Sequence, residues 1–442
     1  MKDTIVAVAT GMATSAGINI IRVSGADAFP IVSGVFKCRK TENGWEPNRM
    51  YLGQIEGKNF SDKAFCVYCK SPFSYTGEDV MEVHCHGGIG VTKAIVALLR
   101  ERGARPAEGG EFTKRAFLNG KITLSEAEGV VDMINATTES QIRNAYRLMT
   151  GDLTKGLTES EKLLTETAAM LEAKLDYPEE LEEETRVGAK ENLERCKANI
   201  AKLLKSAEKR KTITSGIDIA IVGVPNAGKS SLLNALIGQD RAIVCDEAGT
   251  TRDVVKESME SGGIRFNFLD TAGIREENVG KVEKIGIDRS KNAINEADVI
   301  LNVIDLSTEE TDGERKINAL TNGKTVIKVF NKKDIAVRNE SDGIAVCAKN
   351  GDGVDELLDR LQKIAGKDEI YAEGVISNER HVFALEEAKR QVDEALEGYD
   401  FLPSECVLEN VREALKAVGQ ITGTDVSESV VEEIFSRFCV GK

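Results

Sequence analysis

Residues 223–230, Gly-Val-Pro-Asn-Ala-Gly-Lys-Ser, form a glycine-rich loop with the spacing that wraps the phosphates of a nucleotide. The apolar run IDIAIVGV precedes this loop and a helical pattern follows it, as such a loop requires. Glycines let backbone N–H groups approach the phosphates, Lys229 offers a positive charge, and the Ser230 hydroxyl can ligate Mg²⁺. A chance glycine-rich turn is the weaker alternative, because strand, motif and helix occur together. The residues predicted to contact the nucleotide here are Asn226, Ala227, Gly228, Lys229, Ser230 and Ser231.

Two polar segments downstream supply what a γ-phosphate site needs. The sequence Asp-Thr-Ala-Gly at 270–273 closes the apolar run IRFNFLD, where the aspartate can hold the water shell of a metal and the Gly273 amide can meet the γ-phosphate. Between the two loops lies Gly-Thr-Thr-Arg-Asp at 249–253, in which Thr251 is the expected second hydroxyl ligand of Mg²⁺. A plain exposed loop is the alternative for this middle segment. The predicted contacts of the second loop are Asp270, Thr271, Ala272 and Gly273.

A further pair of strand ends selects the base. Asn-Lys-Lys-Asp at 331–334 ends the run TVIKVFN, and the Asp334 carboxylate can accept hydrogen bonds from the ring N–H and exocyclic amine of guanine. Adenine presents neither group in that arrangement, so it would leave the carboxylate unpaired. The next strand ends in Cys347, Ala348 and Lys349, whose backbone can meet the guanine oxygen. These loops predict GTP and GDP as ligands, with Asn331, Lys332 and Asp334 at the base.

Hydrolysis requires a group that orients the attacking water, and the side chain after the Asp-Thr-Ala-Gly loop cannot supply it. Many GTPases place a glutamine there to orient water, but this chain has Ile274, which cannot form a hydrogen bond. Two alternatives remain open from the residues: a carboxylate in the acidic segment that follows, or a cation beside the phosphates.

The elements that must position these loops divide the chain into parts with different patterns of apolar residues. Short apolar runs alternate with turn signals up to about residue 118, which indicates mixed strands and helices. Long helical patterns follow and resume near the C-terminus, whereas strands alternate with helices in between, which is typical of a parallel sheet. A Gly-Gly turn before Ile264 predicts an antiparallel hairpin at one edge of that sheet. The predicted fold is therefore multidomain: an N-terminal α+β domain at 1–118, an all-α domain from 119–215 and 371–442, and an inserted α/β P-loop domain at 216–370.

Composition limits the class of protein. The chain has 442 residues and a net charge of −15, so any nucleic-acid partner must meet a local basic patch. Nine scattered cysteines, no apolar run long enough to span a bilayer and no secretion signal predict a cytoplasmic protein with no membrane partner. Cys66 and Cys69 lie three apart in a strand, where they point to opposite faces and cannot readily share a metal. His84 and His86 are expected to be buried or to cap a turn rather than to bind a metal.

The motifs GxPNxGKS, GTTRD, DTAGIRE and NKKD, with PFSYTGED, HCHGG and the terminal FCVGK, resemble the MnmE (TrmE) family of tRNA modification GTPases over the whole chain. The resemblance implies a homodimer that works with the flavoprotein MnmG (GidA). Together they would add a carboxymethylaminomethyl-type group to carbon 5 of the wobble uridine of certain tRNAs.

The resemblance also implies a folate one-carbon donor, 5-formyl- or methylene-tetrahydrofolate, bound by the N-terminal domain. Arg22, Glu82 and Lys121 would contact it, and Lys442 would lie nearby. An arginine and a lysine suit the carboxylates of folate, and Glu82 can pair with its pterin-like ring. Ordinary surface charges are the alternative for each.

Catalytic roles follow from the same resemblance. A potassium ion would replace an arginine finger, and Glu283 would orient the hydrolytic water, with a solvated helical glutamate as its alternative. Cys439 would serve modification, against the alternative of a buried structural cysteine, and Lys229 completes the catalytic set. The family often has a hydroxyl residue where Cys245 stands and a serine where Cys347 stands, but main-chain contacts would survive both changes. Ligands for K⁺ would be Asn226, Cys245, Glu247 and Thr250, and the nucleotide contacts of this switch would be Cys245, Asp246, Glu247, Ala248, Gly249, Thr250 and Thr251.

Two other classes of protein compete with this interpretation. An Era-like GTPase of ribosome assembly would use the same nucleotide loops, but it carries an RNA-binding module with a GxxG loop and basic flanks. Acidic amphipathic helices follow the nucleotide domain here instead. A purely structural dimerisation scaffold would leave the nucleotide loops without purpose.

Overall fold

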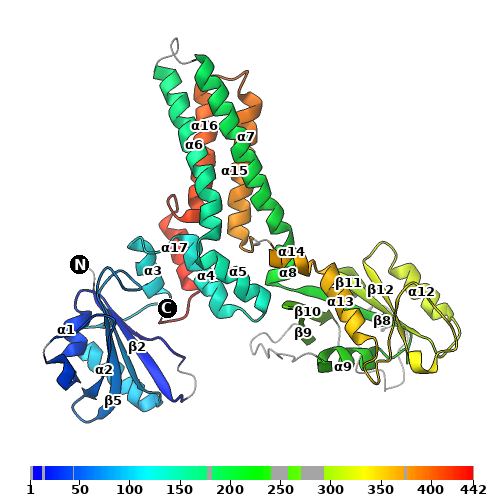
Figure 1. The fold of residues 1–442 in the computed structure, drawn as a ribbon, viewed down its shortest axis with the longest axis horizontal. Helices are drawn as coiled ribbons and strands as arrows, with labels where there is room; N and C mark the ends of the chain where they lie inside the picture. The colour runs from blue at the N-terminus through cyan, green and yellow to red at the C-terminus, as the bar shows by residue number, and fades with distance from the viewer. Residues whose placement is uncertain are drawn as a thin grey trace. The chain divides into compact units, whose positions relative to one another are not determined.

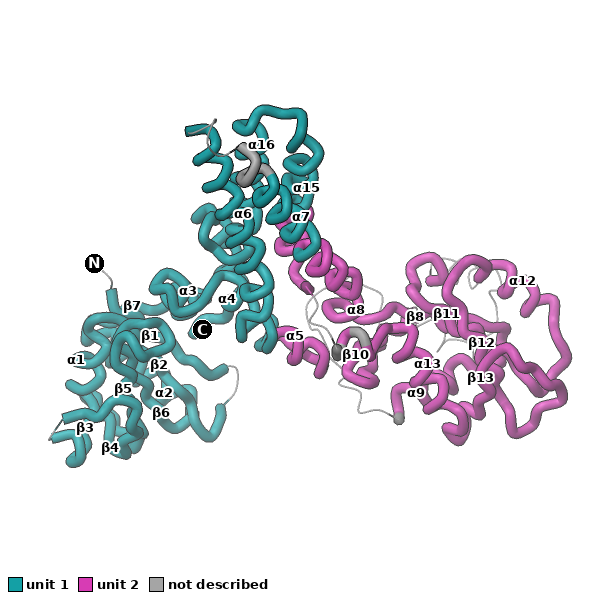
Figure 2. Tube along the Cα trace, turned by 45° about the horizontal axis from the view of Figure 1, so that its top comes forward, with its two compact units in different colours: residues 1–134, 146–199, 387–442 teal, residues 135–145, 200–386 magenta. Residues whose placement is uncertain are grey.

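The computed structural model describes residues 3–11, 15–42, 44–176, 182–239, 257–269, 293–372 and 376–441. The chain forms two compact units (Figure 2): residues 1–134, 146–199 and 387–442 make the first, and residues 135–145 and 200–386 make the second. Within the described ranges, no helix combines the length and apolar character needed to cross a bilayer.

A seven-stranded sheet forms the N-terminal part of the first unit (Figure 1). Its strands follow the order β3-β4-β5-β6-β2-β1-β7. All neighbours are antiparallel except β1 and β7. The strands are β1 (Ile5–Val8), β2 (Ile18–Ser24), β3 (Phe36–Lys37), β4 (Met50–Glu56), β5 (Ser61–Cys69), β6 (Val80–His86) and β7 (Arg105–Pro106). The helical elements are α1 (Ala28–Ser33), η1 (Arg39–Thr41), α2 (Ile89–Glu101) and α3 (Glu111–Leu118).

The two faces of this sheet differ. Alternate residues of the central strands, such as Val23, Cys66 and Val83, pack with α1 and α2 in one core. The opposite face is covered at the β1 end, where Phe112 of α3 packs on Ile5 and Ala7. The alternation expected for a sheet with one buried face is therefore present.

Long helices form the rest of the first unit. Leucines at helical spacing along α6 are buried, and α6 packs along α16. Ion pairs join α6, α7, α15 and α16 across this bundle, including Arg412–Glu172 and Lys197–Asp393. The helices are α4 (Leu124–Asn135), α5 (Glu139–Met149), α6 (Asp152–Asp176), α7 (Glu182–Ser206), α15 (Glu379–Gly398), α16 (Ser404–Thr422) and α17 (Glu428–Ser436). Residues 139–145 of α5, 200–206 of α7 and 379–386 of α15 belong to the second unit. Helical segments from both ends of the chain thus share one core.

The second unit holds a six-stranded sheet in the order β13-β12-β11-β8-β10-β9. It is parallel except for the β9–β10 hairpin, which turns at Gly262 and Gly263, so the predicted edge hairpin is confirmed. The strands are β8 (Ile217–Gly223), β9 (Glu257–Ser261), β10 (Ile264–Leu269), β11 (Val299–Asp305), β12 (Val326–Asn331) and β13 (Ile344–Ala345). The helical elements are η2 (Ala207–Lys209), α8 (Arg210–Thr214), α9 (Lys229–Gln239), α12 (Asp312–Leu320), η4 (Lys333–Ile335), α13 (Val354–Ile364) and α14 (Lys367–Ala372).

The predicted fold class is confirmed: an N-terminal α+β domain, an all-α domain and an inserted α/β P-loop domain. In the parallel sheet, the carboxyl ends of β8, β11, β12 and β13 lie at one edge. The loops that follow β8, β12 and β13 at this edge are among those that the sequence predicts to bind a nucleotide.

Candidate active site

The phosphate loop connects β8 to α9 and is held against two neighbouring segments. A Cβ atom at Gly223 would lie 2.4 Å from the carbonyl oxygen of Val303 on β11. At Gly228, where φ is +96°, a Cβ would lie 2.1 Å from Nδ2 of Asn331. Both positions therefore exclude any side chain, which is the physical reason for the two motif glycines. Asn226, between them, adopts the left-handed region at φ 66°.

The Lys229 side chain lies across this loop. Its ammonium donates to the carbonyl oxygens of Gly223 and Val224, both at 3.0 Å, and the residue is buried at 7% exposure. Lys229 also begins α9, so Ser230 and Ser231 occupy the first turn of that helix. A helix N-terminus directs its unpaired N–H groups and positive dipole end toward an anion. The arrangement suits a polyphosphate.

Asn331 joins three of the predicted loops. Its side chain is buried and donates from Nδ2 to the carbonyl oxygen of Ala227 at 2.9 Å. Its Oδ1 accepts from the Ala348 amide at 3.1 Å. The structure thus brings together the phosphate loop, the guanine loop at 331–334 and the Cys347–Lys349 segment. Asp334, in η4, is exposed and its carboxylate is accessible to a base.

Cys347 and Lys332 have defined partners beside that junction. Cys347 is buried, and its amide donates to the Asp352 carbonyl oxygen at 2.8 Å. Lys332 adopts φ 61°, and its ammonium lies 2.5 Å from a carboxylate oxygen of Asp305 at the end of β11. Asp305 could not be singled out from the sequence, because VIDLSTEE carries no recognised motif.

Many residues predicted for the γ-phosphate side and the folate lie outside the described residues. Their placement stays a prediction. They are Cys245, Asp246, Glu247, Ala248, Gly249, Thr250, Thr251, Asp270, Thr271, Ala272, Gly273, Glu283 and Lys442.

Arg22 and Glu82 form a second polar site on the N-terminal sheet. They are directly opposite each other on β2 and β6, and Arg22 Nε donates to Glu82 Oε1 at 2.8 Å. The guanidinium also lies over the rings of Tyr75 and Phe112, at 5.5 and 5.7 Å from their centroids. His84 Nε2 lies 3.4 Å from the other oxygen of Glu82. The result is a half-buried cluster of one cation, one carboxylate and one imidazole.

Lys121 is held near this cluster by the loop that follows β5. Its ammonium donates to the Pro72 carbonyl oxygen at 3.1 Å, and its aliphatic stem lies against Gly77. Tyr75, which carries Arg22 over its ring, belongs to the same loop and bonds Thr113 of α3 at 2.8 Å. One loop therefore contacts both of the predicted cationic ligands.

The expectation for the two histidines is wrong for His84. It lies in the middle of β6, half-buried, and neither caps a turn nor enters the core, because α1 and α2 cover only the other face of the sheet. His86 ends the strand, is exposed, and bonds Asp62 through Nδ1 at 2.5 Å. The alternation of Glu82 and His84 in one strand was the signal that both face the same side.

The cysteines of β5 have the predicted geometry. Cys66 is fully buried in the core with α1 and α2, whereas Cys69 lies on the opposite face and feels the charge of Glu82. Burial raises the pKa of both thiols, so both are protonated at neutral pH.

Cys439 lies on the surface, which excludes the alternative of a buried structural cysteine. The tail that carries it runs along the N-terminal domain: Val440 pairs with Gly109, and the Gly110 amide donates to the Cys439 carbonyl oxygen at 3.4 Å. A Cβ on Gly441 would lie 2.2 Å from the Val8 carbonyl oxygen. Upstream, Phe435 and Phe438 of the α17 region pack on each other and into a core with Leu124.

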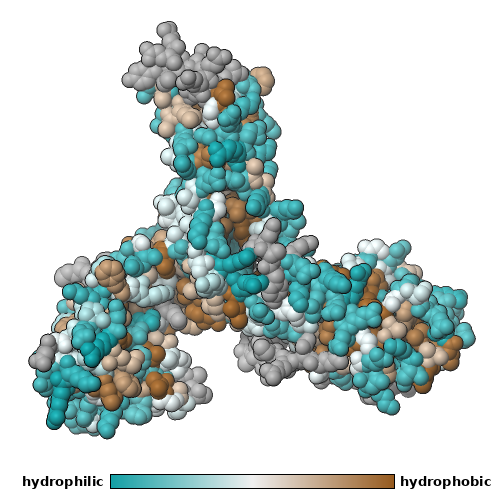
Figure 3. Space-filling model, in the orientation of Figure 1, coloured by the Kyte–Doolittle hydropathy of each residue, from teal (hydrophilic) through white to brown (hydrophobic). Residues whose placement is uncertain are grey.

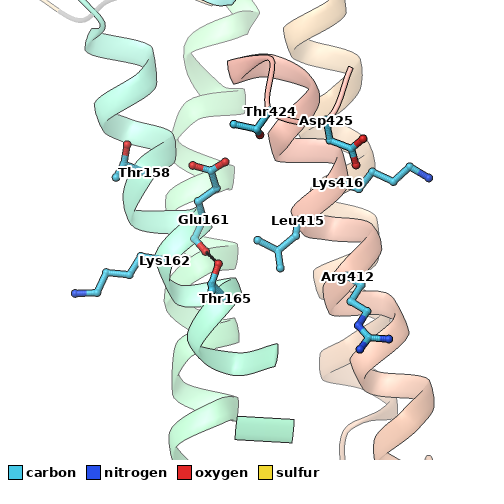
Figure 4. A pocket seen from close by; sticks show the side chains of 9 residues that line it. All are labelled: Thr158, Glu161, Lys162, Thr165, Arg412, Leu415, Lys416, Thr424 and Asp425. Carbon is cyan, nitrogen blue, oxygen red and sulfur yellow. Dashed lines mark hydrogen bonds between the residues drawn. The ribbon is translucent and has the colours of Figure 1, made fainter. Parts of the chain in front are cut away.

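A groove of about 520 Å³ lies between α6 and α16 (Figure 4). Glu161 and Thr165 of α6 line it with Arg412 and Leu415 of α16, and burial raises the pKa of Glu161. Thr165 donates to the Glu161 carbonyl oxygen, and Arg412 is paired with Glu172. The groove contains none of the residues predicted to carry chemistry.

The parallel sheet, the phosphate loop between β8 and α9, and the guanine-type loop on β12 define a P-loop domain of the GTPase class. Two family models match the chain: "GTP-binding protein TrmE N-terminus" over residues 4–121 and "MnmE helical domain" over residues 124–439. The chain belongs to the MnmE family.

Curated relatives extend over the full length. The chain is 38% identical to the tRNA modification GTPase MnmE of Natranaerobius thermophilus and 37% identical to that of Clostridioides difficile, with 100% of each chain covered. Among solved structures, it is similar to Era in complex with MgGDPNP and ribosomal RNA, at 26% identity and a TM-score of 0.27, covering 40% of this chain and 66% of that one.

Proposed function

We propose that the chain hydrolyses GTP and uses the hydrolysis to modify carbon 5 of the wobble uridine of certain tRNAs, together with the flavoprotein MnmG (GidA). The group added is of the carboxymethylaminomethyl type. One observation carries this proposal: the likeness to tRNA modification GTPases covers all of this chain and all of those relatives. An Era-like regulator would account for the nucleotide domain alone. A cytoplasmic location, where tRNA is found, is part of the proposal.

The residues at the phosphate loop fit the metals of this function. Mg²⁺ takes hydroxyl ligands beside the phosphates. Ser230, in the first turn of α9, would supply one of them, and Thr251 would supply the second. Asn226 is exposed on the loop, and its side-chain amide oxygen is the kind of ligand that K⁺ takes. Cys245, Glu247 and Thr250 would complete the K⁺ site. The cations would neutralise the charge on the phosphates, while Glu283 would orient water.

The cation role is tested by phosphate release from GTP in KCl and in NaCl at equal ionic strength. Faster hydrolysis in potassium is the expected result, and equal rates would exclude K⁺ from the mechanism. The modification is tested separately by mass spectrometry of tRNA nucleosides from cells that lack the chain. If the wobble uridines of those cells still carried the modification, the proposed function would be refuted.

The cluster around Arg22 is the proposed folate site. Arg22 and Lys121 provide two cations for carboxylates, and Glu82 provides a carboxylate for the N–H groups of a pterin-like ring. The aromatic ring of Tyr75 beside Arg22 adds an apolar surface for a planar ligand. Calorimetry with 5-formyl-tetrahydrofolate should show binding by the full chain and a weaker affinity for Glu82→Gln. Equal affinity would remove Glu82 from the site.

An apolar patch on the uncovered face of the same sheet supports the proposed homodimer. Ile18, Met50, Leu52 and Phe65 are exposed at 62, 51, 60 and 42%. Leu52 lies opposite Phe65, and Phe65 lies opposite His84, so the patch is continuous with the Glu82 cluster. Hydrophobic side chains are visible on the surface of the first unit in Figure 3. Exposed apolar surface of this kind is typical of an interface.

The dimer is tested by light scattering after size exclusion. Wild type should have twice the mass of one chain, and Leu52→Ser combined with Phe65→Ser should shift it toward one chain. A wild-type mass of one chain at micromolar concentration would refute the proposal.

A further inference from the structure

Four charged side chains form a connected group behind the guanine loop. Asp305 and Lys332 make one pair, and Glu314 and Arg338 make the other, with 2.8 Å between Arg338 Nη2 and Glu314 Oε2. Arg338 also donates to the Asp305 backbone oxygen at 3.1 Å, which connects the two pairs. The carboxylates of both pairs are buried, at 6% exposure for Asp305 and 4% for Glu314. Buried charges are costly to leave unpaired, so the pairing constrains the backbone on both sides.

The orientation of the Asp305 carboxylate is fixed by Ser307 as well as by Lys332. Its Oδ1 accepts from the amide of Ser307 at 2.8 Å and from the Ser307 hydroxyl at 2.6 Å, which leaves Oδ2 for the Lys332 ammonium at 2.5 Å. Burial by itself would raise the pKa of Asp305, but the lysine and the two Ser307 donors hold it below the ordinary value. The carboxylate is therefore an ionised, oriented anchor at neutral pH.

The anchored lysine lies within the loop that presents Asp334. Lys332 follows the buried Asn331 and adopts the left-handed backbone region, so its peptide cannot relax without a change of φ. Backbone hydrogen bonds hold the two ends of the loop: Leu306 N donates to Asn331 O at 3.0 Å, and Val337 N donates to Leu306 O at 2.8 Å. Between these ends, the Asp305–Lys332 pair is a side-chain restraint on the start of η4.

The second pair connects this loop to the phosphate loop. Glu314 lies in the first turn of α12, where the Thr311 hydroxyl accepts from its amide. In the same turn, a Cβ at Gly313 would lie 2.9 Å from Cγ1 of Val224, so α12 packs directly on the phosphate loop. The two ion pairs therefore connect the guanine loop to α12, and α12 in turn packs on the phosphate loop.

We propose that Asp305 is a positioning residue for guanine recognition: by holding the Lys332 ammonium, it sets the pose of the loop that carries Asp334 without touching the nucleotide. This inference rests on the proposed nucleotide site. It predicts that the effect of Asp305 on nucleotide affinity is transmitted through Lys332. A merely structural role for Asp305 would instead lower stability and affinity independently of Lys332.

The test is a double-mutant cycle on GDP affinity with the full chain. Asp305→Asn keeps the shape of the side chain, and its Oδ1 can still accept from Ser307, but it loses the charge. We expect GDP to bind roughly tenfold more weakly, the size of effect typical of one lost charge-assisted hydrogen bond. The KM for GTP should rise more than kcat falls. In the Lys332→Met background, the same substitution should have little further effect on affinity.

Asp359→Asn is the matched control, because Asp359 is an exposed carboxylate on α13 of the same domain and the chemical change is identical. It should bind GDP as wild type does. Unchanged GDP affinity in Asp305→Asn would overturn the inference, and so would an equal loss in the Lys332→Met background. If Asp305→Asn does not fold, Asp305→Glu takes its place; it keeps the charge but displaces the carboxylate, and wild-type affinity in that variant would equally overturn the inference. A wild-type chain that binds no GDP would instead refute the nucleotide site itself.

Discussion

Gly441→Ala is a sharp test of how the C-terminal tail is held. Gly441 adopts φ +104°, and an added Cβ would lie 2.2 Å from the carbonyl oxygen and 3.0 Å from the carbonyl carbon of Val8. Val8 cannot retreat easily, because it is paired with Ile21 inside the sheet. An L residue held in such a conformation costs about 1–3 kcal/mol, before any contribution from the clash.

The free energy that the tail gains from its contacts is of similar size to this strain energy. The described backbone contact is the Val440–Gly109 bridge, and the 3.4 Å hydrogen bond from the Gly110 amide to the Cys439 carbonyl oxygen belongs to that bridge. One such hydrogen bond is worth about 0.5–1.5 kcal/mol. The strain therefore offsets the docking energy, and the variant should release residues 439–441. The α17 helix should remain in place, because Phe435 and Phe438 pack upstream of the change. GTP hydrolysis should stay near the wild-type rate while tRNA modification is lost.

Two measurements check this outcome. Hydrogen exchange of the Gly110 amide should accelerate by about tenfold or more when its acceptor leaves, and nucleoside mass spectrometry should show the loss of modified wobble uridine. Val440→Ala is the control, because its side chain is 61% exposed and its backbone pairing survives. Wild-type exchange at Gly110 in Gly441→Ala would refute the strain argument. If residues 439–441 were released but tRNA modification stayed normal, the docked tail would not be needed for modification.

Three further outcomes are expected. Glu283→Ala should lower the turnover of GTP by ~10²-fold with little loss of nucleotide affinity, because Ile274 cannot position water; wild-type turnover would discard the assignment. Cys439→Ser should preserve hydrolysis and abolish tRNA modification, and normal nucleosides would remove the thiol from the mechanism. Burial, with repulsion from Glu128, raises the pKa of half-buried Asp132 to about 6 from 3.8. The folded chain thus binds that proton more tightly than the unfolded chain, and stability falls as pH rises between these values. Asp132→Asn should therefore raise Tm at pH 7.5 and lose this advantage near pH 4, whereas an equal gain at both pH values would contradict the shift.

The nucleotide loops could be predicted because their residues act locally. Gly223 and Gly228 are needed by the backbone that they themselves form, and the Gly-Gly turn at 262–263 specifies its own hairpin. Asp305 could not be found in this way. Its partner Lys332 lies 27 residues later, directly after the strand β12, and the pair becomes visible only when β11 and β12 are placed side by side.

The N-terminal cluster shows the same limit over a longer stretch of sequence. Strand alternation places Glu82 and His84 on one face, but nothing in the sequence says that α1 and α2 cover the other face and leave this one open. Pairing across 60 residues then brings Arg22 to Glu82. The role of Gly441 also depends on a distant partner, since Val8 lies at the opposite end of the chain.

The insertion of the nucleotide domain into a helical domain follows from how its two connections meet. The chain enters through the end of α7 and α8 and leaves through the residues before α15. These connections are tied together: Ile376 N donates to Ser206 Oγ at 3.4 Å, and Arg210 pairs with Glu379 at 3.3 Å. A domain whose ends lie in contact can be inserted without separating the elements that flank it. The segments 124–134, 146–199 and 387–442 can consequently form one helical core although more than 180 residues, from 200 to 386, precede the last of them.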